Sequence, residues 1–195
     1  MSRPSLEPEY FDRLYAEDPD PWGFATSDYE RDKYAATLAA LPAGRRYPRA
    51  LECGCANGVF TERLAPRCDA LLAVDAAERA VTAARERLAS RPHVSLERRV
   101  LPAELPAGPF DLVVCSEVLY YWDAATLRDA LPRLRDALAP GGSLLAVHWR
   151  HPTRTYPLQG DEVHALLHAE LGLSPAMTAT TDDYRLDRFD RPRVA

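Results

Sequence analysis

Residues 50–60 read Ala50-Leu51-Glu52-Cys53-Gly54-Cys55-Ala56-Asn57-Gly58-Val59-Phe60. The apolar run ends in a carboxylate and then turns through two glycines into a segment that we expect to be helical from Val59. Glycine has no Cβ and tolerates positive φ, so such a turn lets backbone N–H groups approach a ligand closely. A ligand in that position also lies at a helix N-terminus, which favours negative charge. The stretch therefore predicts a strand–turn–helix corner that binds a ligand.

The next apolar run, residues 70–74, ends in Asp75. A carboxylate about 20 residues after a glycine turn is placed to accept hydrogen bonds from a ribose diol. A dinucleotide site requires the spacing G-x-G-x-x-G, whereas this chain has Gly54-x-Ala56-x-Gly58. The two runs together predict a nucleoside cofactor that is not a dinucleotide. A plain strand–turn–helix corner of another α/β protein is the alternative.

Length and composition predict one globular domain. The chain has 195 residues, 47% of them hydrophobic, and a net charge of −5. The mild acidity argues against a nucleic-acid substrate, for which a basic face is expected. No apolar run approaches the roughly 18 residues of a spanning helix, and residues 1–8 lack the apolar core of a signal peptide. We therefore expect a cytoplasmic protein that binds neither nucleic acid nor membrane.

Strand and helix patterns alternate after an N-terminal helical segment. Residues 5–41 have helical spacing with a break at 18–22. The expected strands cover residues 50–53, 70–74, 94–100, 110–116 and 143–149, the expected helices residues 59–65, 77–90, 124–138 and 160–171, and a closing hairpin residues 174–180 and 184–189. Repeated β-α units predict an α/β, Rossmann-like fold with a doubly wound, mostly parallel sheet. A single domain, 1–195, would consist of an N-terminal helical cap (1–44) and an α/β core (45–195).

The segment Glu52-x-Gly54-x-Ala56-x-Gly58 resembles motif I of the class I S-adenosylmethionine (SAM) dependent methyltransferases. Ala56 replaces a glycine that is common in that motif. Two flanking blocks, residues 18–30 and 116–121, resemble the NodS-like group of nodulation N-methyltransferases, which methylate the free amine of a partly deacetylated chitooligosaccharide. The resemblance covers roughly residues 10–150. It implies the class I methyltransferase fold with an antiparallel C-terminal hairpin, and SAM as cofactor with S-adenosylhomocysteine (SAH) as product.

Ligands of open α/β sheets bind beyond the carboxyl ends of the strands, so the candidate cofactor residues follow each expected strand. Arg99 stands where the family often has an aspartate that accepts from adenine, and an arginine cannot accept. We therefore expect the Leu101 side chain and the Val100 backbone to hold the adenine, with ordinary packing of Leu101 as the alternative. The expected cofactor-binding residues are Trp22, Tyr29, Glu52, Gly54, Cys55, Ala56, Gly58, Asp75, Ala76, Val100, Leu101, Ser116 and Glu117.

Four residues are candidates for catalysis: Glu117, Tyr120, Tyr121 and His148. A nitrogen nucleophile reacts as a neutral amine, and any of the four could orient it or take its proton. Tyr121 or Trp22 could also face the sulfonium charge. The alternatives are packing for the aromatic residues, a capping role for Glu117 and a surface-loop position for His148.

No metal site is expected. His164 and His168 lie one helical turn apart, but no carboxylate cluster accompanies them, and Cys53-x-Cys55 lacks a second ligand pair. We expect the four cysteines to be buried thiols.

The sequence thus predicts a SAM-dependent methyltransferase acting on a small-molecule acceptor, with the amine of an amino sugar or oligosaccharide as the first choice. An O-methyltransferase of natural-product biosynthesis and a non-catalytic SAM-binding module are the alternatives. The oligomeric state is left open between monomer and homodimer. The N-terminal helices are expected to form a lid over the acceptor pocket, the alternative being a simple cover for a sheet edge.

Overall fold

A computed structural model describes residues 3–193, which form two compact units. The amino-terminal unit is Glu7–Leu101, and the carboxy-terminal unit consists of residues 3–6 and 102–193. The outermost residues of the predicted cap and core (1–2 and 194–195) lie outside the described part. Within that part, none of the helices has the length and apolar character needed to cross a bilayer.

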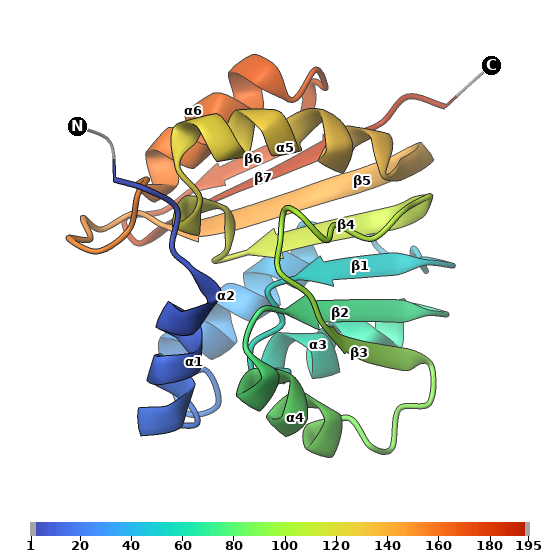
Figure 1. Cartoon of the computed structure of the whole chain (residues 1–195). Helices are drawn as coiled ribbons and strands as arrows, with labels where there is room; N and C mark the ends of the chain where they lie inside the picture. Colours follow the sequence, from blue (N-terminus) through green and yellow to red (C-terminus); the bar gives the residue numbers. More distant parts are fainter. Residues whose placement is uncertain (1–2, 194–195) are drawn as a thin grey trace. The chain divides into compact units, whose positions relative to one another are not determined.

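The amino-terminal unit holds three parallel strands in the order β3-β2-β1 (Figure 1). Its elements are α1 (Pro8–Glu17), α2 (Asp28–Ala39), β1 (Ala50–Cys53), α3 (Val59–Leu64), η1 (Ala65–Arg67), β2 (Leu71–Asp75), α4 (Glu78–Arg87) and β3 (Val94–Arg98). The predicted break between the first two helices is present, and Ser27 caps α2 by accepting from the Glu30 N–H. Helix α4 packs on β2 and β3, and α1 packs on α4.

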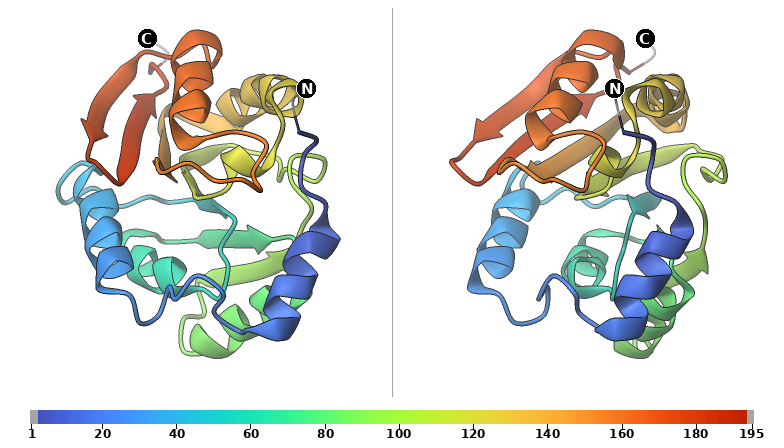
Figure 2. Two further views of the ribbon diagram at one scale, coloured as in Figure 1. Left: turned by 90° about the vertical axis from the view of Figure 1, so that its left-hand side faces the viewer. Right: turned by 60° about the vertical axis from the view of Figure 1, so that its left-hand side comes forward.

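The carboxy-terminal unit holds the other four strands in the order β4-β5-β7-β6. Its elements are β4 (Phe110–Ser116), η2 (Leu119–Tyr121), α5 (Ala124–Asp136), β5 (Leu138–Trp149), α6 (Gly160–Glu170), β6 (Pro175–Thr180) and β7 (Tyr184–Asp190). Strands β4 and β5 are parallel, whereas β7 pairs antiparallel with both β5 and β6. Figure 2 shows the red β6–β7 hairpin with the orange helix α6 beside it. The predicted closing hairpin is therefore present.

Strand β5 begins earlier than the sequence predicts. We expected Ser143 as its first residue, because Pro140-Gly141-Gly142 is typical of a stop between helix and strand. In the structure Phe110 pairs with Leu138, the register then shifts, and Leu112 pairs with Ser143. A Cβ on Gly142 would lie 2.8 Å from the Phe110 carbonyl oxygen, so only glycine fits this close approach. The proline and glycines thus form an irregular first segment of β5, where the register with β4 shifts.

Buried apolar side chains from both faces of the strands form the cores of the two units. Four consecutive residues of β4, Leu112–Cys115, are fully buried, as expected for a strand covered on both faces. All four cysteines, Cys53, Cys55, Cys68 and Cys115, are buried free thiols, which confirms that prediction.

Candidate functional site

The loop after β1 is fastened to the end of β2. The N–H groups of Gly54 and Cys55 both donate to the Val74 carbonyl oxygen, at 2.8 and 3.0 Å. The Ala56 N–H donates to Oδ2 of Asp75 at 2.9 Å, and the Gly58 N–H donates to the Cys55 carbonyl at 2.9 Å. These four N–H groups are therefore used within the protein, contrary to the expectation that the loop directs them at a ligand. What the loop provides is a backbone held close to two carboxyl groups.

Tight backbone geometry shapes this loop. Gly54 and Gly58 have φ values of +76° and +79°, and Ala56 has a φ of +49° although it carries a Cβ. A Cβ on Gly58 would lie 3.0 Å from the Cβ of Ala84 in α4. Gly58 is thus required both by its left-handed φ and by the close approach of α4.

Glu52 is a buried carboxyl group at the end of β1. Its side chain is 1% exposed, and its Oε2 has no hydrogen-bond partner among residues 3–193. Burial, together with the negative charge of Asp75, raises the pKa of Glu52 to about 8. A buried polar atom without a partner is costly, so Glu52 is suited to pair with a cationic or hydrogen-donating ligand.

Asp75 lies at the corresponding end of β2 and is partly exposed. Its two oxygens accept from the N–H groups of Ala56 and Ala77, at 2.9 and 3.0 Å. Burial raises its pKa above the ordinary value, and the backbone N–H bonds oppose that rise. A carboxylate oxygen has two lone pairs, so each oxygen retains the capacity to accept from a ligand hydroxyl.

The segment that precedes α2 is fastened to the same loop. Asp20 accepts from the N–H groups of Phe24 and Ala25, both at 2.9 Å, and from Nδ2 of Asn57 at 3.0 Å. The indole of Trp22 packs with Tyr15 of α1 in a cluster that includes Ala56. Trp22 and Ala56 of the loop therefore pack against the same cluster.

Another predicted cofactor residue of this unit, Tyr29, lies on α2. The ring of Tyr29 is 5.2 Å from Nζ of Lys33, which also donates to Oε1 of Glu30 at 2.8 Å. Tyr29 and Lys33 thus share a face of α2.

The segment after β3 carries Val100 and Leu101, both half-buried. The Arg99 N–H donates to the Asp75 carbonyl at 2.9 Å, and its guanidinium donates to Glu97 at 2.7 Å. The guanidinium is thus held on its own strand by Glu97. Ala76 follows Asp75, and its carbonyl oxygen accepts from Arg98.

In the carboxy-terminal unit, Glu117 follows Ser116 at the end of β4 with a φ of +55°. Such a φ is strained for a residue with a Cβ and is held only where the surroundings enforce it. The Glu117 N–H donates to the Val147 carbonyl at 2.9 Å. Its Oε2 accepts from the Tyr120 hydroxyl at 2.7 Å and from the Trp149 N–H at 2.9 Å. These bonds hold the carboxylate in one orientation.

Three tyrosines pack around this carboxylate. The ring centroids of Tyr120, Tyr121 and Tyr156 lie 4.8 Å from one another in every pair. Burial raises the pKa values of Tyr120 and Tyr121 well above 10, so both phenols are neutral and act as donors rather than bases. Tyr156 was not predicted, because the loop between β5 and α6 has no periodic pattern that would place it.

His148, a candidate for catalysis, lies inside the carboxy-terminal unit. Its side chain is fully buried within β5, which rules out the surface-loop alternative. Its Nε2 accepts from the Leu119 N–H at 3.2 Å, and its Nδ1 lies 3.1 Å from Nε2 of His164. Both ring nitrogens are thus used inside the protein, which favours a supporting role for His148 over direct contact with the acceptor.

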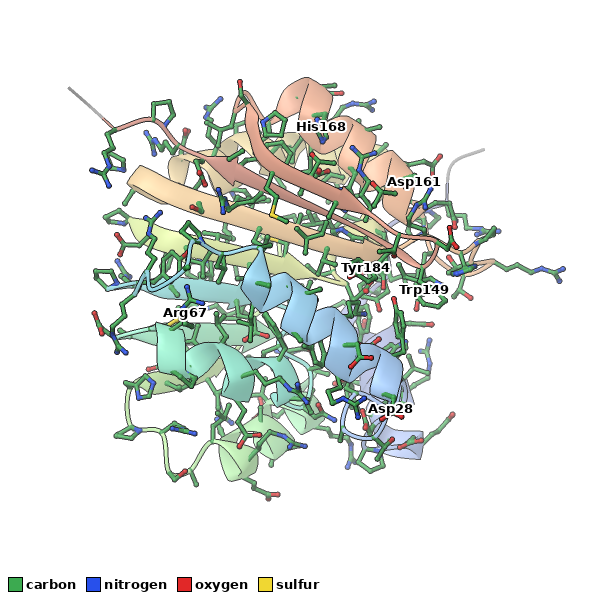
Figure 3. The ribbon with its side chains drawn as sticks, turned by 180° about the vertical axis from the view of Figure 1, so that it is seen from behind. Asp28, Arg67, Trp149, Asp161, His168 and Tyr184 are labelled. Atoms are coloured by element: carbon green, nitrogen blue, oxygen red, sulfur yellow. The ribbon has the colours of Figure 1, made fainter. Side chains whose placement is uncertain are left out.

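A single carboxylate, that of Asp187, accompanies the histidine pair of α6. Oδ2 of Asp187 accepts from Nδ1 of His164 at 2.6 Å, from Nε2 of His168 at 2.9 Å and from Arg185 at 3.1 Å. Figure 3 shows Asp161 and His168 on α6, and Trp149 with Tyr184 where β5 pairs with β7. Throughout residues 3–193, no group of three or more His, Cys, Asp or Glu side chains is arranged to hold a metal ion.

Comparison with known proteins identifies the family. Residues 11–152 match the family model described as Nodulation protein S (NodS). Nodulation protein S of Rhizobium tropici is 39% identical over 127 residues, which are 65% of this chain and 53% of that protein. The chain thus spans about half the length of this curated relative.

Solved structures match over most of the chain. The crystal structure of the N-methyltransferase NodS from Bradyrhizobium japonicum WM9, in complex with SAH, is 30% identical with a TM-score of 0.84, and the match covers 95% of this chain and 98% of that one. A provisionally assigned methyltransferase from Pseudomonas syringae is 44% identical with a TM-score of 0.70, covering 84% and 99%. These matches confirm the predicted class I methyltransferase fold. The chain belongs to the Nodulation protein S family.

Proposed function

We propose that this protein is a SAM-dependent methyltransferase whose amino-terminal unit binds the methyl donor. The observation that carries the proposal is Glu52, a buried carboxyl with an unpartnered oxygen beside the glycine loop. The methionine moiety of SAM carries an ammonium group, and pairing with it would return Glu52 to its ionised form. The related NodS of B. japonicum holds SAH, which supports the same use of this loop.

Asp75 would bind the ribose hydroxyls with the lone pairs that its backbone bonds leave available. When bound, SAM supplies a methyl group made electrophilic by the positive sulfur. We propose that the remaining contacts come from the other residues expected at the cofactor: Trp22, Tyr29, Gly54, Cys55, Ala56, Gly58, Ala76, Val100, Leu101 and Ser116.

We propose an amine as the acceptor, in an amino sugar or an oligosaccharide. Glu117 is the candidate group for orienting the amine and taking its proton, because its carboxylate is fixed by Tyr120 and Trp149. Tyr120 and Tyr121 would act as neutral hydrogen-bond donors beside Glu117, and their rings would pack against the acceptor. Methyl transfer requires an in-line approach, so such positioning can supply much of the rate. The N-methyltransferase activity of the B. japonicum relative supports this choice.

The organisation of the chain is part of the same proposal. We propose that residues 1–195 act as one methyltransferase domain, with residues 1–44 as its cap. The bonds from Asp20 to Phe24, Ala25 and Asn57 support a cap that covers the loop after β1.

The test is methyl transfer to a defined acceptor. The full chain is incubated with SAM and a glucosamine tetramer, and mass spectrometry follows the gain of one CH2 unit. The fully N-acetylated tetramer is the matched control, because it has the same hydroxyls but no free amine. We expect transfer to the free amine alone, with the position read by NMR, and loss of turnover in Glu117→Gln.

Other outcomes select the alternatives. Methylation of a hydroxyl on either tetramer would favour an O-methyltransferase. Tight SAH binding by calorimetry without turnover of any offered acceptor would favour a non-catalytic SAM-binding module. Absence of SAM and SAH binding at millimolar concentration would refute the proposal as a whole.

A further inference from the structure

A buried chain of hydrogen bonds runs across three elements of the carboxy-terminal unit. It begins at Oδ2 of Asp187 in β7, which lies 2.6 Å from Nδ1 of His164 in α6. Nε2 of His164 lies 3.1 Å from Nδ1 of His148 in β5, and Nε2 of His148 lies 3.2 Å from the backbone nitrogen of Leu119. The three side chains are fully buried. The chain therefore links a carboxylate to the backbone of η2.

The protons of this chain can be placed in one way. A backbone N–H is always a donor, so Nε2 of His148 must present its lone pair to Leu119. The neutral imidazole then carries its proton on Nδ1 and donates to Nε2 of His164. His164 in turn carries its proton on Nδ1 and donates to Asp187. Each of the three hydrogen bonds in the chain then joins a donor to an acceptor.

A further proton has no favourable place in this arrangement. On Nε2 of His148 it would face the Leu119 N–H, and on Nε2 of His164 it would face the His148 proton. Burial lowers the pKa of His164 in spite of the nearby Asp187, which agrees with a neutral ring. Burial by itself raises the pKa of Asp187, but hydrogen bonds, foremost from His164, outweigh it and keep the carboxylate ionised. The charged or titratable groups around the chain are Arg185, His168, Asp161, Glu117 and Tyr120.

The chain ends on the segment that carries the acceptor-side residues. His148 holds residue 119 through its side chain, and the next residue, Trp149, holds Glu117 through its backbone N–H. The strained φ of Glu117 makes such support necessary. His164 and Asp187 lie beyond residues 11–152, the part of the chain that matches the family model.

We propose that His164 and Asp187 are positioning residues, which act through His148 to hold the segment Glu117–Tyr121 in the orientation that receives the acceptor. The inference rests on the proposed function, because it is there that Glu117 and Tyr120 face the acceptor. Neither His164 nor Asp187 touches the reacting atoms. Their role is to fix the direction of the His148 ring and thereby the backbone of η2.

The first measurement needs no acceptor. Imidazole 15N NMR of the full chain reports which ring nitrogen carries the proton. We expect both His148 and His164 as neutral rings protonated on Nδ1, and a slowly exchanging Leu119 amide. A His148 ring protonated on Nε2 would overturn the proposal, because it could not accept from Leu119.

The second measurement compares three variants. His164→Phe fills the space without hydrogen bonds, whereas His164→Gln can still accept from His148 and donate to Asp187. Val163→Ala removes buried apolar volume from the neighbouring position of α6 and serves as the control for general destabilisation. We expect His164→Phe to speed Leu119 amide exchange about tenfold, the equivalent of one lost hydrogen bond, and His164→Gln to restore it to within about threefold. SAH affinity should not change.

The same variants are assayed with SAM and the glucosamine tetramer, where His164→Phe should raise the acceptor KM while Val163→Ala does not. Equal effects of Val163→Ala and His164→Phe on Leu119 exchange would show a merely structural role and overturn the proposal. If His164→Phe does not fold, the proposal is still tested by the imidazole tautomers of the unmodified protein and by the Leu119 amide exchange rate in His164→Gln. If the unmodified protein does not methylate the tetramer, the proposed acceptor is wrong. The imidazole tautomers and the Leu119 amide exchange rates then still test the positioning role of His164 and Asp187.

Discussion

The backbone nitrogen of Ala56 lies 2.9 Å from Oδ2 of Asp75, and this bond joins the loop after β1 to the end of β2. The same carboxylate accepts from Ala77 through its other oxygen. Asp75 therefore has two tasks, one toward the protein and one, in the proposed function, toward the ribose of the cofactor.

Asp75→Asn should weaken SAH binding by about 10- to 100-fold. The new amide NH2 would face the N–H of Ala56 or of Ala77, and a donor cannot satisfy a donor; the loss corresponds to one or two charge-assisted hydrogen bonds. Calorimetry with SAH measures the change. Asp69→Asn is the matched control, because it removes an exposed carboxylate of the same unit that pairs with Arg46. An unchanged affinity in Asp75→Asn would remove Asp75 from the site.

Glu52 should make the ligand-free protein less stable as the pH rises from about 4.5 to 8. Burial raises its folded-state pKa from 4.5 to about 8, so in this range the folded state holds a proton that the unfolded state has released. The contribution of the protonated Glu52 to the stability of the fold is complete below pH 4.5 and is lost as the pH rises through 8. Urea denaturation at a series of pH values measures the free energy of unfolding. We expect this free energy to fall less steeply with pH in Glu52→Gln than in the unmodified protein. The same substitution at the exposed Glu86 is the control, and an equal slope in both variants would contradict the prediction.

Gly58→Ala should destabilise the protein more than Gly44→Ala. Both glycines have a left-handed φ, +79° and +70°, so both substitutions incur backbone strain on the order of 1–2 kcal/mol. A Cβ at residue 44 meets nothing within 4 Å, whereas a Cβ at residue 58 meets Ala84 at 3.0 Å. Overpacking adds about 1–3 kcal/mol at residue 58 alone. Denaturant unfolding measures the difference, and equal losses would show that α4 moves aside freely.

Ser5 and Asp123 should show coupled effects on stability. Asp123 caps α5 by accepting from Ala125 and Thr126, and its other oxygen accepts from the Ser5 hydroxyl at 2.9 Å. Asp123→Ala should cost about 1 kcal/mol, as for other lost helix caps. Since its removal takes away the carboxylate that accepts from the Ser5 hydroxyl, Ser5→Ala should cost less in the Asp123→Ala background than alone. A double-mutant cycle by denaturation measures the coupling, and additive costs would contradict it.

The sequence predicts best those elements whose residues carry their own signal. Strand β4 was predicted with its observed ends, Phe110 and Ser116, because a run of apolar residues buried on both faces is visible locally. The start of β5 was missed for the opposite reason. Pro140 and the two glycines after it have a local preference for a turn, and only pairing with Phe110 on the neighbouring strand overrides it.

The candidate site likewise contains some features with a local sequence signal and others that depend on contacts between distant residues. The loop from Glu52 to Gly58 and the carboxylate of Asp75 have a fixed spacing along the chain, and the sequence predicts their meeting correctly. Asp187 has no such signal: it is 23 residues from His164 and meets it only because β7 pairs with β5 while α6 packs against both. For His148, residue type alone suggested a base, whereas its burial and the Leu119 N–H determine its actual role.

The bonds of Asp20 have a consequence for the timing of turnover. One carboxylate fastens the cap backbone at Phe24 and Ala25 and the side chain of Asn57 on the loop. A cap that moves away from the loop must break the bond between Asp20 and Asn57, so we expect that bond to oppose the departure of a bound nucleoside. In the proposed enzyme Asp20 would then influence how quickly the spent cofactor is exchanged for a fresh one.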